Sequence, residues 1–293
     1  MTARTVIKLS TALYMAVFFG FLFGPLVVMG ITAFNTSSYP QVTPFEGFTL
    51  GWFAALADDD ELLYGLGNSL RIGVFVVLLA VPLGLAGALV MQQIYARARS
   101  LYYLIVVSPV LTPGVIIGIS TVIFWRDLTG LTGTRFLYNG VVLTVLGQSS
   151  FISAYCMLIF LARLQRFDRS LPEAGLDLGA SHQQVFFHIL LPFLRPAILS
   201  AAVMAFLSSF ENYNTTTFAI LADKTLTTVL AGRVRQGTSP TLSALAVAIV
   251  ALTVAGAVAF EVLKRREDRH RAAGHAAAAA AERRELAQVV RPA

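Results

Sequence analysis

The sequence has little charge. Only 13% of its 293 residues are Asp, Glu, Lys or Arg, and 56% are apolar, whereas about 25% of residues are charged in an ordinary soluble domain. A chain this poor in charge has too little polar surface to cover a water-soluble globule, so a typical cytosolic enzyme is excluded. Its high hydrophobicity also excludes an intrinsically disordered chain. The composition therefore predicts a membrane-embedded protein, for which this length provides about six spans.

Cysteine is almost absent. The single Cys156 lies inside an apolar run, so the chain can form no intrachain disulfide and has no cysteine spacing for a metal site. We interpret it as a packed thiol without a chemical role. The net charge of +6 would raise nucleic acid as a partner of a soluble protein. In a membrane protein cytoplasmic cationic loops explain this charge, and no nucleic-acid partner is predicted.

Motifs for chemistry are also lacking. The sequence contains no G-x-x-x-x-G-K-[ST] phosphate-binding loop. No nucleophile–base pair or set of metal ligands stands out. The chain is therefore not expected to be an enzyme, and any energy from ATP must come from a partner protein.

Six apolar stretches, most of them at least 20 residues long, predict transmembrane helices, because they lack the alternation of barrel strands. This makes the protein an all-α polytopic membrane protein. We assign residues 1–265 to a transmembrane domain with a cytoplasmic loop at about 163–195, and 266–293 to a basic, alanine-rich tail of no assigned function. Trp52 and its neighbours predict a short interfacial helix in the first outer loop. The predicted spans cover about 9–34, 72–91, 101–125, 136–162, 197–221 and 241–260.

The distribution of lysine and arginine predicts the orientation. Most of the 22 basic residues fall on the side of the N-terminus when the six spans are laid out in order. Because basic residues concentrate in cytoplasmic loops, both termini are predicted to be cytoplasmic.

The long cytoplasmic loop predicts a helix, a break and a second helix. Ser170 and Glu173 have the spacing of a capping box, and Gly179 can supply a left-handed stop. Ser181 can cap the second helix, and Pro192 marks its end or a kink into the fifth span. The residues alone leave two interpretations open: a docking element for another protein, or a simple surface connector.

Glu211 is the one ionisable residue predicted to lie well inside a span, where an unpaired charge is costly. A polar run that includes Tyr213 and Asn214 follows it. One interpretation is a solute pathway in which Glu211 attracts a cation and Tyr213 offers a ring face. The alternatives are an internal pair, for example with Arg126, or a charge near the outer interface.

Three further features of the spans have two interpretations each. Trp125 and Asp127 are either an interfacial aromatic with its charged flank or contacts for a solute. Pro109 and Pro113 mark either a hinge or a static kink in the third span. Gln148 and the serines around it in the fourth span favour interhelical hydrogen bonding over a binding site.

The cytoplasmic loop resembles a known motif. Glu173-Ala174-Gly175, three residues, Gly179, nine residues and then Ile189-Leu190-Leu191-Pro192 are similar to the EAA loop of ABC-importer permeases, with Gly175 where alanine is usual. The resemblance implies a type I ABC importer permease fold, in which this loop forms a coupling helix on a separate ATPase. ATP and Mg would be bound by that ATPase and not by this chain. The implied coupling residues are Glu173, Ala174, Gly175, Gly179, Ile189, Leu191 and Pro192.

Other segments resemble the spermidine/putrescine-type permeases. The resemblance implies the second permease of a heterodimer in the bacterial inner membrane, with two cytoplasmic ATPases and an extracytoplasmic substrate-binding protein. The implied solute is a polyamine; an aminophosphonate or ferric iron is the alternative. From the residues alone, a self-sufficient secondary transporter and a membrane scaffold also remain open. The segments are Asn68-Ser69-Leu70, Ser108-Pro109, Pro113-Gly114, Ser208-Phe210-Glu211 and Thr238-Ser239-Pro240.

Overall fold

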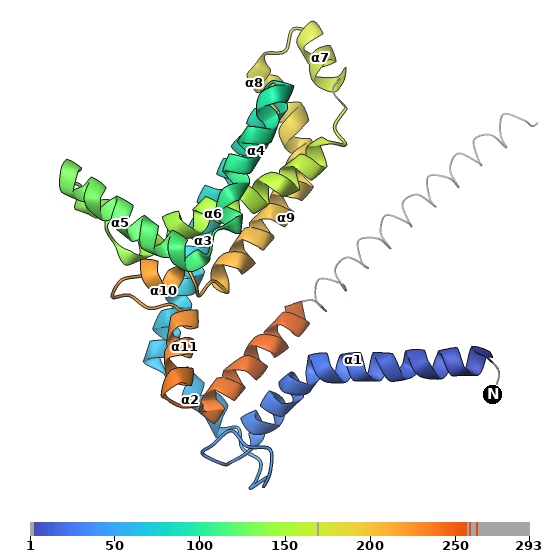
Figure 1. Cartoon of the computed structure of the whole chain (residues 1–293), viewed down its shortest axis with the longest axis vertical. Coiled ribbons are helices and arrows are strands. Elements are labelled where there is room, and N and C mark those ends of the chain that lie inside the picture. The colour runs from blue at the N-terminus through green and yellow to red at the C-terminus, as the bar shows by residue number, and fades with distance from the viewer. Residues whose placement is uncertain (1–2, 169, 257, 259–261, 263–293) are drawn as a thin grey trace, which may run out of the picture. The chain divides into compact units, whose positions relative to one another are not determined.

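The computed structural model describes residues 3–168, 170–256, 258 and 262, and long helices dominate this part of the chain (Figure 1). The predicted all-α membrane architecture is confirmed, and the tail at 266–293 lies outside the described residues. A shorter apolar helix, Pro240–Gly256, begins where the sixth span is predicted. Five helices are long and apolar enough to cross a bilayer: Ile7–Phe34, Asp60–Gln93, Gly114–Thr132, Gly140–Leu164 and His182–Phe210.

The chain folds as two units, of which the first contains residues 1–58 and 238–293. Its described part includes α1 (Ala3–Phe34) and α2 (Gly51–Ala57), the short helix predicted around Trp52. The fully buried Asn35 organises the loop between them, because its side-chain amide donates to two backbone carbonyls of that loop. The Trp52 indole nitrogen donates to the Asn35 carbonyl at 2.8 Å, which ties α2 to the end of α1.

The second unit, residues 59–237, is built around three packed helices, α3 (Asp60–Gln93), α6 (Gly140–Leu164) and α9 (Leu191–Phe210). Alanines spaced by four residues on α9 form one face that admits close approach of the neighbouring helices. The fully buried core side chains include Val76, Ala80, Ala88, Ile152, Cys156, Met157, Phe160, Leu194, Ala201 and Ala205.

The backbones of α3 and α6 touch at Gly84. A Cβ atom placed there would clash with the Cβ of Cys156 and would lie 2.7 Å from the Ser153 carbonyl oxygen. Cys156 is fully buried at this crossing. Its place in the core agrees with the interpretation of a packed thiol.

The third predicted span, 101–125, is two helices, and the predicted interruption lies at Pro113, whereas Pro109 lies inside the first helix. α4 (Ala96–Leu111) and α5 (Gly114–Thr132) are separated at Thr112 and Pro113, and α5 departs from the direction of α4 (Figure 1). Pro113 has no N–H to continue the helix and disfavours helical backbone at the residue before it. Thr112 is accordingly extended, with φ −84° and ψ 131°.

The fifth predicted span, 197–221, is wrong at both ends. Helical structure begins earlier, because α8 (His182–Val185) and the π-helical turn η2 (Phe186–Leu190) run directly into α9. It ends earlier too, at Phe210. A turn then leads to α10 (Thr216–Ala219) and α11 (Leu226–Gln236). Asparagine and threonine side chains in this turn compete for backbone hydrogen bonds, which explains the break.

We predict that Gly84→Ala destabilises the protein by about 1–3 kcal/mol, because the added methyl meets the α6 backbone, which cannot move aside. Gly67→Ala is the matched control on the same helix, since a Cβ at Gly67 has no neighbour within 4 Å. That control is expected to be neutral or slightly stabilising. The thermal unfolding midpoints of the detergent-purified variants test the prediction, and equal midpoints would contradict it.

Candidate functional site

The loop between α6 and α9 forms a compact helix pair. α7 (Ser170–Asp177) is terminated by Gly179, which lies two residues beyond its last helical residue and has a φ of +87°. The Ala180 N–H donates to the Gly175 carbonyl and the Gly179 N–H to the Leu176 carbonyl, at 3.0 and 2.9 Å. This is a Schellman ending, in which glycine supplies the left-handed residue without steric cost. The predicted stop at Gly179 is confirmed.

The start of α8 also matches its prediction. The Gln184 N–H donates to the Ser181 hydroxyl, and the Ser181 N–H donates to the Gln184 side-chain oxygen, which together make a capping box. The capping role predicted for Ser170 is wrong, because Ser170 lies inside α7. Its N–H donates instead to the Asp168 carboxylate at 2.9 Å. This hydrogen bond holds the pKa of Asp168 below its usual value.

Gly175 lies where α7 packs against the following helix. A Cβ at Gly175 would lie 3.1 Å from Ile189 Cδ1 and 3.3 Å from Val185 Cγ2, so even an alanine here would require these two side chains to move by a few tenths of an ångström. The motif therefore divides into two parts. Gly175 and Ile189 hold the helix pair together, whereas Glu173 and Ala174 are exposed.

Four large apolar side chains of the helix pair are exposed as well, and they retain between 36% and 89% of their accessible area. The other motif residues, Leu191 and Pro192, are half-buried in the first turn of α9. The exposed side chains are Leu171, Leu176, Leu178 and Phe187.

At the other end of α9, the turn after Phe210 is built by Asn212. Its side-chain oxygen accepts the N–H groups of Thr215 and Thr216, at 3.1 and 3.3 Å. Its carbonyl accepts the hydroxyls of Thr216 and Thr227, at 2.7 and 3.1 Å. These bonds replace the helical hydrogen bonds that end at Phe210, so the break is satisfied from within the chain.

Gln148 connects this turn to the core. The side chain is 1% exposed. Its amide nitrogen donates to the Thr216 hydroxyl at 2.8 Å, and its oxygen accepts from the Ser209 hydroxyl. Interhelical hydrogen bonding by Gln148 is therefore confirmed. Ser150 and Ser153 bond to carbonyls of their own helix instead.

The two helix breaks meet. A Cβ at Gly114, the first residue of α5, would lie 2.9 Å from the Thr215 hydroxyl and 3.0 Å from the Asn214 Cβ. The turn after α9 thus packs on the start of α5, and α10 packs along the same helix. Irregular backbone inside apolar helices is tolerated where it is buried in protein or lines a cavity, and paired breaks of this kind are typical of solute pathways.

Three of the predicted pathway residues, Glu211, Tyr213 and Asn214, lie in or beside the turn after α9. Glu211 is the exposed C-terminal cap of α9, so it lies at a helix end and not, as predicted, within a continuous helix. Asn214 is exposed in the turn, and the half-buried Tyr213 accepts a hydrogen bond from Arg235 at 2.9 Å. Arg126 pairs with the adjacent Asp127 at 3.1 Å and not with Glu211.

Trp125 and Asp127 line two adjoining cavities on α5. Trp125 belongs to a cavity of about 450 Å³ bounded by α4, α5 and α6. Asp127 belongs to one of about 440 Å³, and both cavities include Ser120 and Phe124. Sequence reasoning missed the hydroxyls of the first cavity, although isolated serines and threonines within apolar helices are a signal for them. These hydroxyl residues are Ser108, Thr112, Ser120, Thr121 and Ser150.

Comparison with known proteins identifies the family. The model of the binding-protein-dependent transport system inner membrane component family matches residues 80–269. The chain belongs to this family. This confirms the resemblance to ABC-importer permeases that the Glu173 loop indicates, and it makes the chain a transport subunit of the inner membrane.

Two curated relatives align with this permease over most of their own length. The putrescine transport system permease protein PotI of Escherichia coli (strain K12) is 31% identical over 85% of this chain and 89% of the relative. The spermidine/putrescine transport system permease protein PotC of the same strain is 24% identical over 86% and 92%.

Solved structures share the permease fold. A chain of a bacterial alginate ABC transporter in complex with an alginate pentasaccharide-bound periplasmic protein superposes with a TM-score of 0.64, at 19% identity. The match covers 86% of this permease and 92% of that chain. A second alginate-importing ABC transporter gives a TM-score of 0.58 at 15% identity, over 90% and 98%.

In this permease the two candidate sites lie at opposite ends of α6 and α9 (Figure 1). The helix pair follows the last residue of α6 and leads into α9. The paired breaks lie beyond the last residue of α9 and beside the first half of α6. Beyond the breaks, Arg233 of α11 binds Asp59 and Glu61 at the start of α3, and holds the pKa of Asp59 below its usual value.

We predict that Gln148→Leu destabilises the permease by about 1–3 kcal/mol, because the Ser209 and Thr216 hydroxyls lose a buried partner. Ser150→Ala is the control in the same helix, since that hydroxyl bonds only to a carbonyl of its own helix. Its effect should stay within about 0.5 kcal/mol. Thermal unfolding in detergent measures the stability of both variants. Similar losses of stability would show that the bridging hydrogen bonds of Gln148 do not stabilise the permease.

Proposed function

We propose that this permease couples ATP hydrolysis by separate ATPase subunits to import of a polyamine, through the α7–α8 helix pair. One observation carries the proposal. The pair presents Glu173 and Ala174 beside exposed leucines, while Gly175 and Ile189 hold it rigid. An exposed apolar surface with a defined charge suits a protein partner. ATP and Mg belong to that partner, since this chain has no phosphate-binding loop.

Movement of the helix pair reaches the solute path through α9. α8, η2 and α9 form one uninterrupted helix from His182 to Phe210, and a packed helix transmits displacement rather than absorbing it. Its far end carries Glu211 and the turn built by Asn212. A partner that pushes or pulls the pair would therefore shift the turn against the start of α5. This reorientation exposes the path to one side of the membrane or the other.

The proposed orientation places the α7–α8 end in the cytoplasm. Arg97, Arg99, Arg163 and Arg166 lie at the helix ends on this side, as expected for cytoplasmic loops. Both termini are then cytoplasmic. The opposite end, with α11, faces a substrate-binding protein outside the bacterial inner membrane. A second, related permease completes the pathway beside this chain, in a heterodimer with two ATPases.

The chemistry of the path suits a polyamine. Such a solute carries ammonium groups on a hydrocarbon chain, so it needs carboxylates, hydroxyl acceptors and aromatic faces in alternation. Glu211, Asp127 and Trp125 offer the first and last of these, and the cavity hydroxyls offer the second. The names of PotI and PotC support the same class. Carboxylates in the path favour it over an aminophosphonate; ferric iron is the alternative cation.

We predict that Glu173→Lys leaves the permease folded and in the membrane but abolishes uptake. The residue is exposed, so charge reversal spares the helix pair and alters only the surface offered to the ATPase. Uptake of labelled putrescine by cells that depend on this system measures the effect, and immunoblotting of membranes measures the amount of protein. Asp58→Lys reverses an exposed acid at the end of α2 and should transport normally. Normal uptake by the Glu173 variant would refute the coupling role.

We predict that Glu211→Gln lowers uptake of a cationic solute about fivefold, the effect of one exposed charge pair. Uptake of a neutral or anionic solute should change less, because only the carboxylate charge is removed. Glu46→Gln, at an exposed acid of the first unit, is the control. Equal effects of Glu211→Gln on both kinds of solute would show that the carboxylate does not act through its charge.

A further inference from the structure

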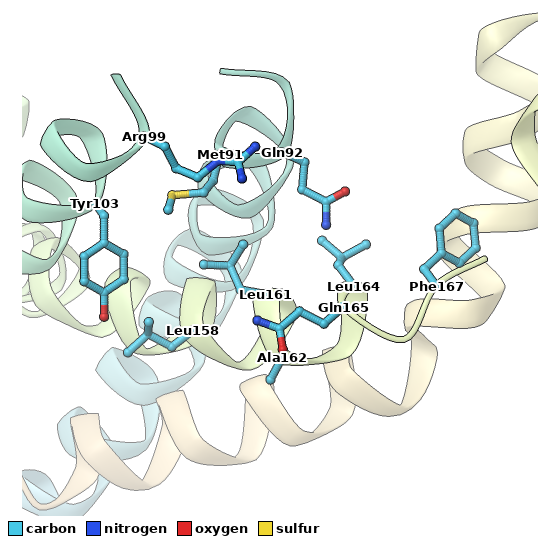
Figure 2. A pocket seen from close by; sticks show the side chains of 10 residues that line it. All are labelled: Met91, Gln92, Arg99, Tyr103, Leu158, Leu161, Ala162, Leu164, Gln165 and Phe167. Atoms are coloured by element: carbon cyan, nitrogen blue, oxygen red, sulfur yellow. The ribbon is translucent and has the colours of Figure 1, made fainter. Parts of the chain in front are cut away.

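A cavity lined by none of the predicted pathway residues lies beside the end of α6, where the chain enters the α7–α8 helix pair (the coupling loop). It measures about 470 Å³ and is framed by the end of α3, the start of α4 and the end of α6 (Figure 2). Arg99 and Tyr103 enter it from α4, and Arg99 extends toward Met91 at the end of α3. Gln165 and Phe167, which follow α6, line the side nearest the α7–α8 helix pair.

The polar lining of this cavity favours an anion. Its four polar side chains, Gln92, Arg99, Tyr103 and Gln165, can all donate hydrogen bonds, and no carboxylate lines it. In the part of the chain that the structure describes, the ion pairs involve Arg126, Lys224 and Arg233 only. The Arg99 guanidinium therefore meets the cavity without a carboxylate partner.

The rest of the lining is apolar. The cavity lies where the exposed side chains of α4 change from basic to aliphatic. Arg97 and Arg99 are followed at once by Leu101, Leu104 and Ile105, which are 62%, 62% and 61% exposed. Arginines followed by outward-facing aliphatic side chains mark the boundary between lipid headgroups and hydrocarbon. A molecule bound here would have its polar group at Arg99 and an apolar part against residues such as Leu158 and Leu161.

We propose that this cavity binds the phosphate headgroup of an anionic phospholipid, phosphatidylglycerol for example, with its acyl chains leaving along α4 and α6. Arginine is well suited to a phosphate, and each further donor of the lining adds a charge-assisted hydrogen bond. A cationic solute fits less well, because the lining offers it no carboxylate. The bound lipid joins α3, α4 and α6 at the point where the coupling loop begins. The inference goes beyond the proposed transport function.

Labelling of Cys156 tests the proposal. It is the only cysteine of the chain and is fully buried where α6 crosses α3, two of the helices that frame the cavity, so its reaction with a fluorescent maleimide reports the separation of these two helices. The full-length permease, co-purified with its partner subunits, is delipidated and heated with phosphatidylglycerol, phosphatidylcholine of the same acyl chains, or inorganic phosphate. We expect phosphatidylglycerol alone to raise the temperature at which Cys156 in this chain becomes labelled.

Arg99→Gln should lower the affinity for phosphatidylglycerol about tenfold, as loss of a charge-assisted hydrogen bond predicts. Arg99→Lys should retain part of it. Arg97→Gln is the matched control, because it removes the same charge from the same helical turn but does not line the cavity. If Arg99→Gln does not fold, Gln165→Ala tests the same site from α6 and should also weaken the effect.

Three results would overturn the proposal. Equal phosphatidylglycerol effects in the Arg99→Gln and Arg97→Gln variants would indicate general attraction of lipid to the basic surface. An equal effect of inorganic phosphate would indicate a site for a free anion. Loss of ATPase co-purification in Arg99→Gln, with the lipid effect intact, would make the cavity a protein contact. These readouts do not require uptake, so a failure of the Glu173 experiment leaves them interpretable.

Discussion

The contact of α3 with α6 at Gly84 is the constraint on which the rest of the second unit depends. Because the two backbones are this close, the alanine face of α9 packs against both α3 and α6. The three helices then form one apolar core. The α7–α8 helix pair and the polar turn after Phe210 are both attached to ends of these helices. The coupling loop joins α6 to α9, and the polar turn follows α9. A packed core of this kind has low compressibility and transmits strain. A displacement at the α7–α8 end of α9 is therefore expected to reach the turn after Phe210.

The polar break at the far end of α9 illustrates how such a core tolerates irregular backbone. Inside a bilayer an unsatisfied N–H or carbonyl costs several kcal/mol. Here Asn212 supplies the missing acceptors and Gln148 ties the turn to α6, so few groups remain unpaired. One that remains is the fully buried Thr215 hydroxyl, which has no partner in the described part of the chain and lies against the start of α5. The break is therefore stable enough to persist, and it abuts the helix that carries Trp125 and Asp127.

The opposite end is organised by different forces. The coupling loop keeps its shape through local backbone bonds, namely the Schellman ending at Gly179 and the capping box at Ser181, rather than through a large core. The π-helical turn over Phe186–Leu190 accommodates Pro192, whose missing N–H leaves the carbonyl of the preceding turn without its donor. A rigid loop continuous with α9 needs no further hinge at this point. The cavity at Arg99 adds a place where the surrounding membrane could influence the same end.

The sequence alone determined the features that depend on composition and local backbone chemistry. Apolar stretches predicted membrane helices, Gly179 and Ser181 predicted the loop ends, and the spacing from Glu173 to Pro192 indicated the family. It misplaced features that depend on competition between distant groups. Proline predicted an interruption of the third span but did not decide between Pro109 and Pro113, and Glu211 was placed within a helix because hydropathy averages across the turn after Phe210. Only the tertiary structure decided that the two breaks meet at Gly114, that Gln148 bridges Ser209 and Thr216, and that Arg99 enters a cavity without a carboxylate. These contacts join residues far apart in the chain, and which of them form is determined by how the helices pack.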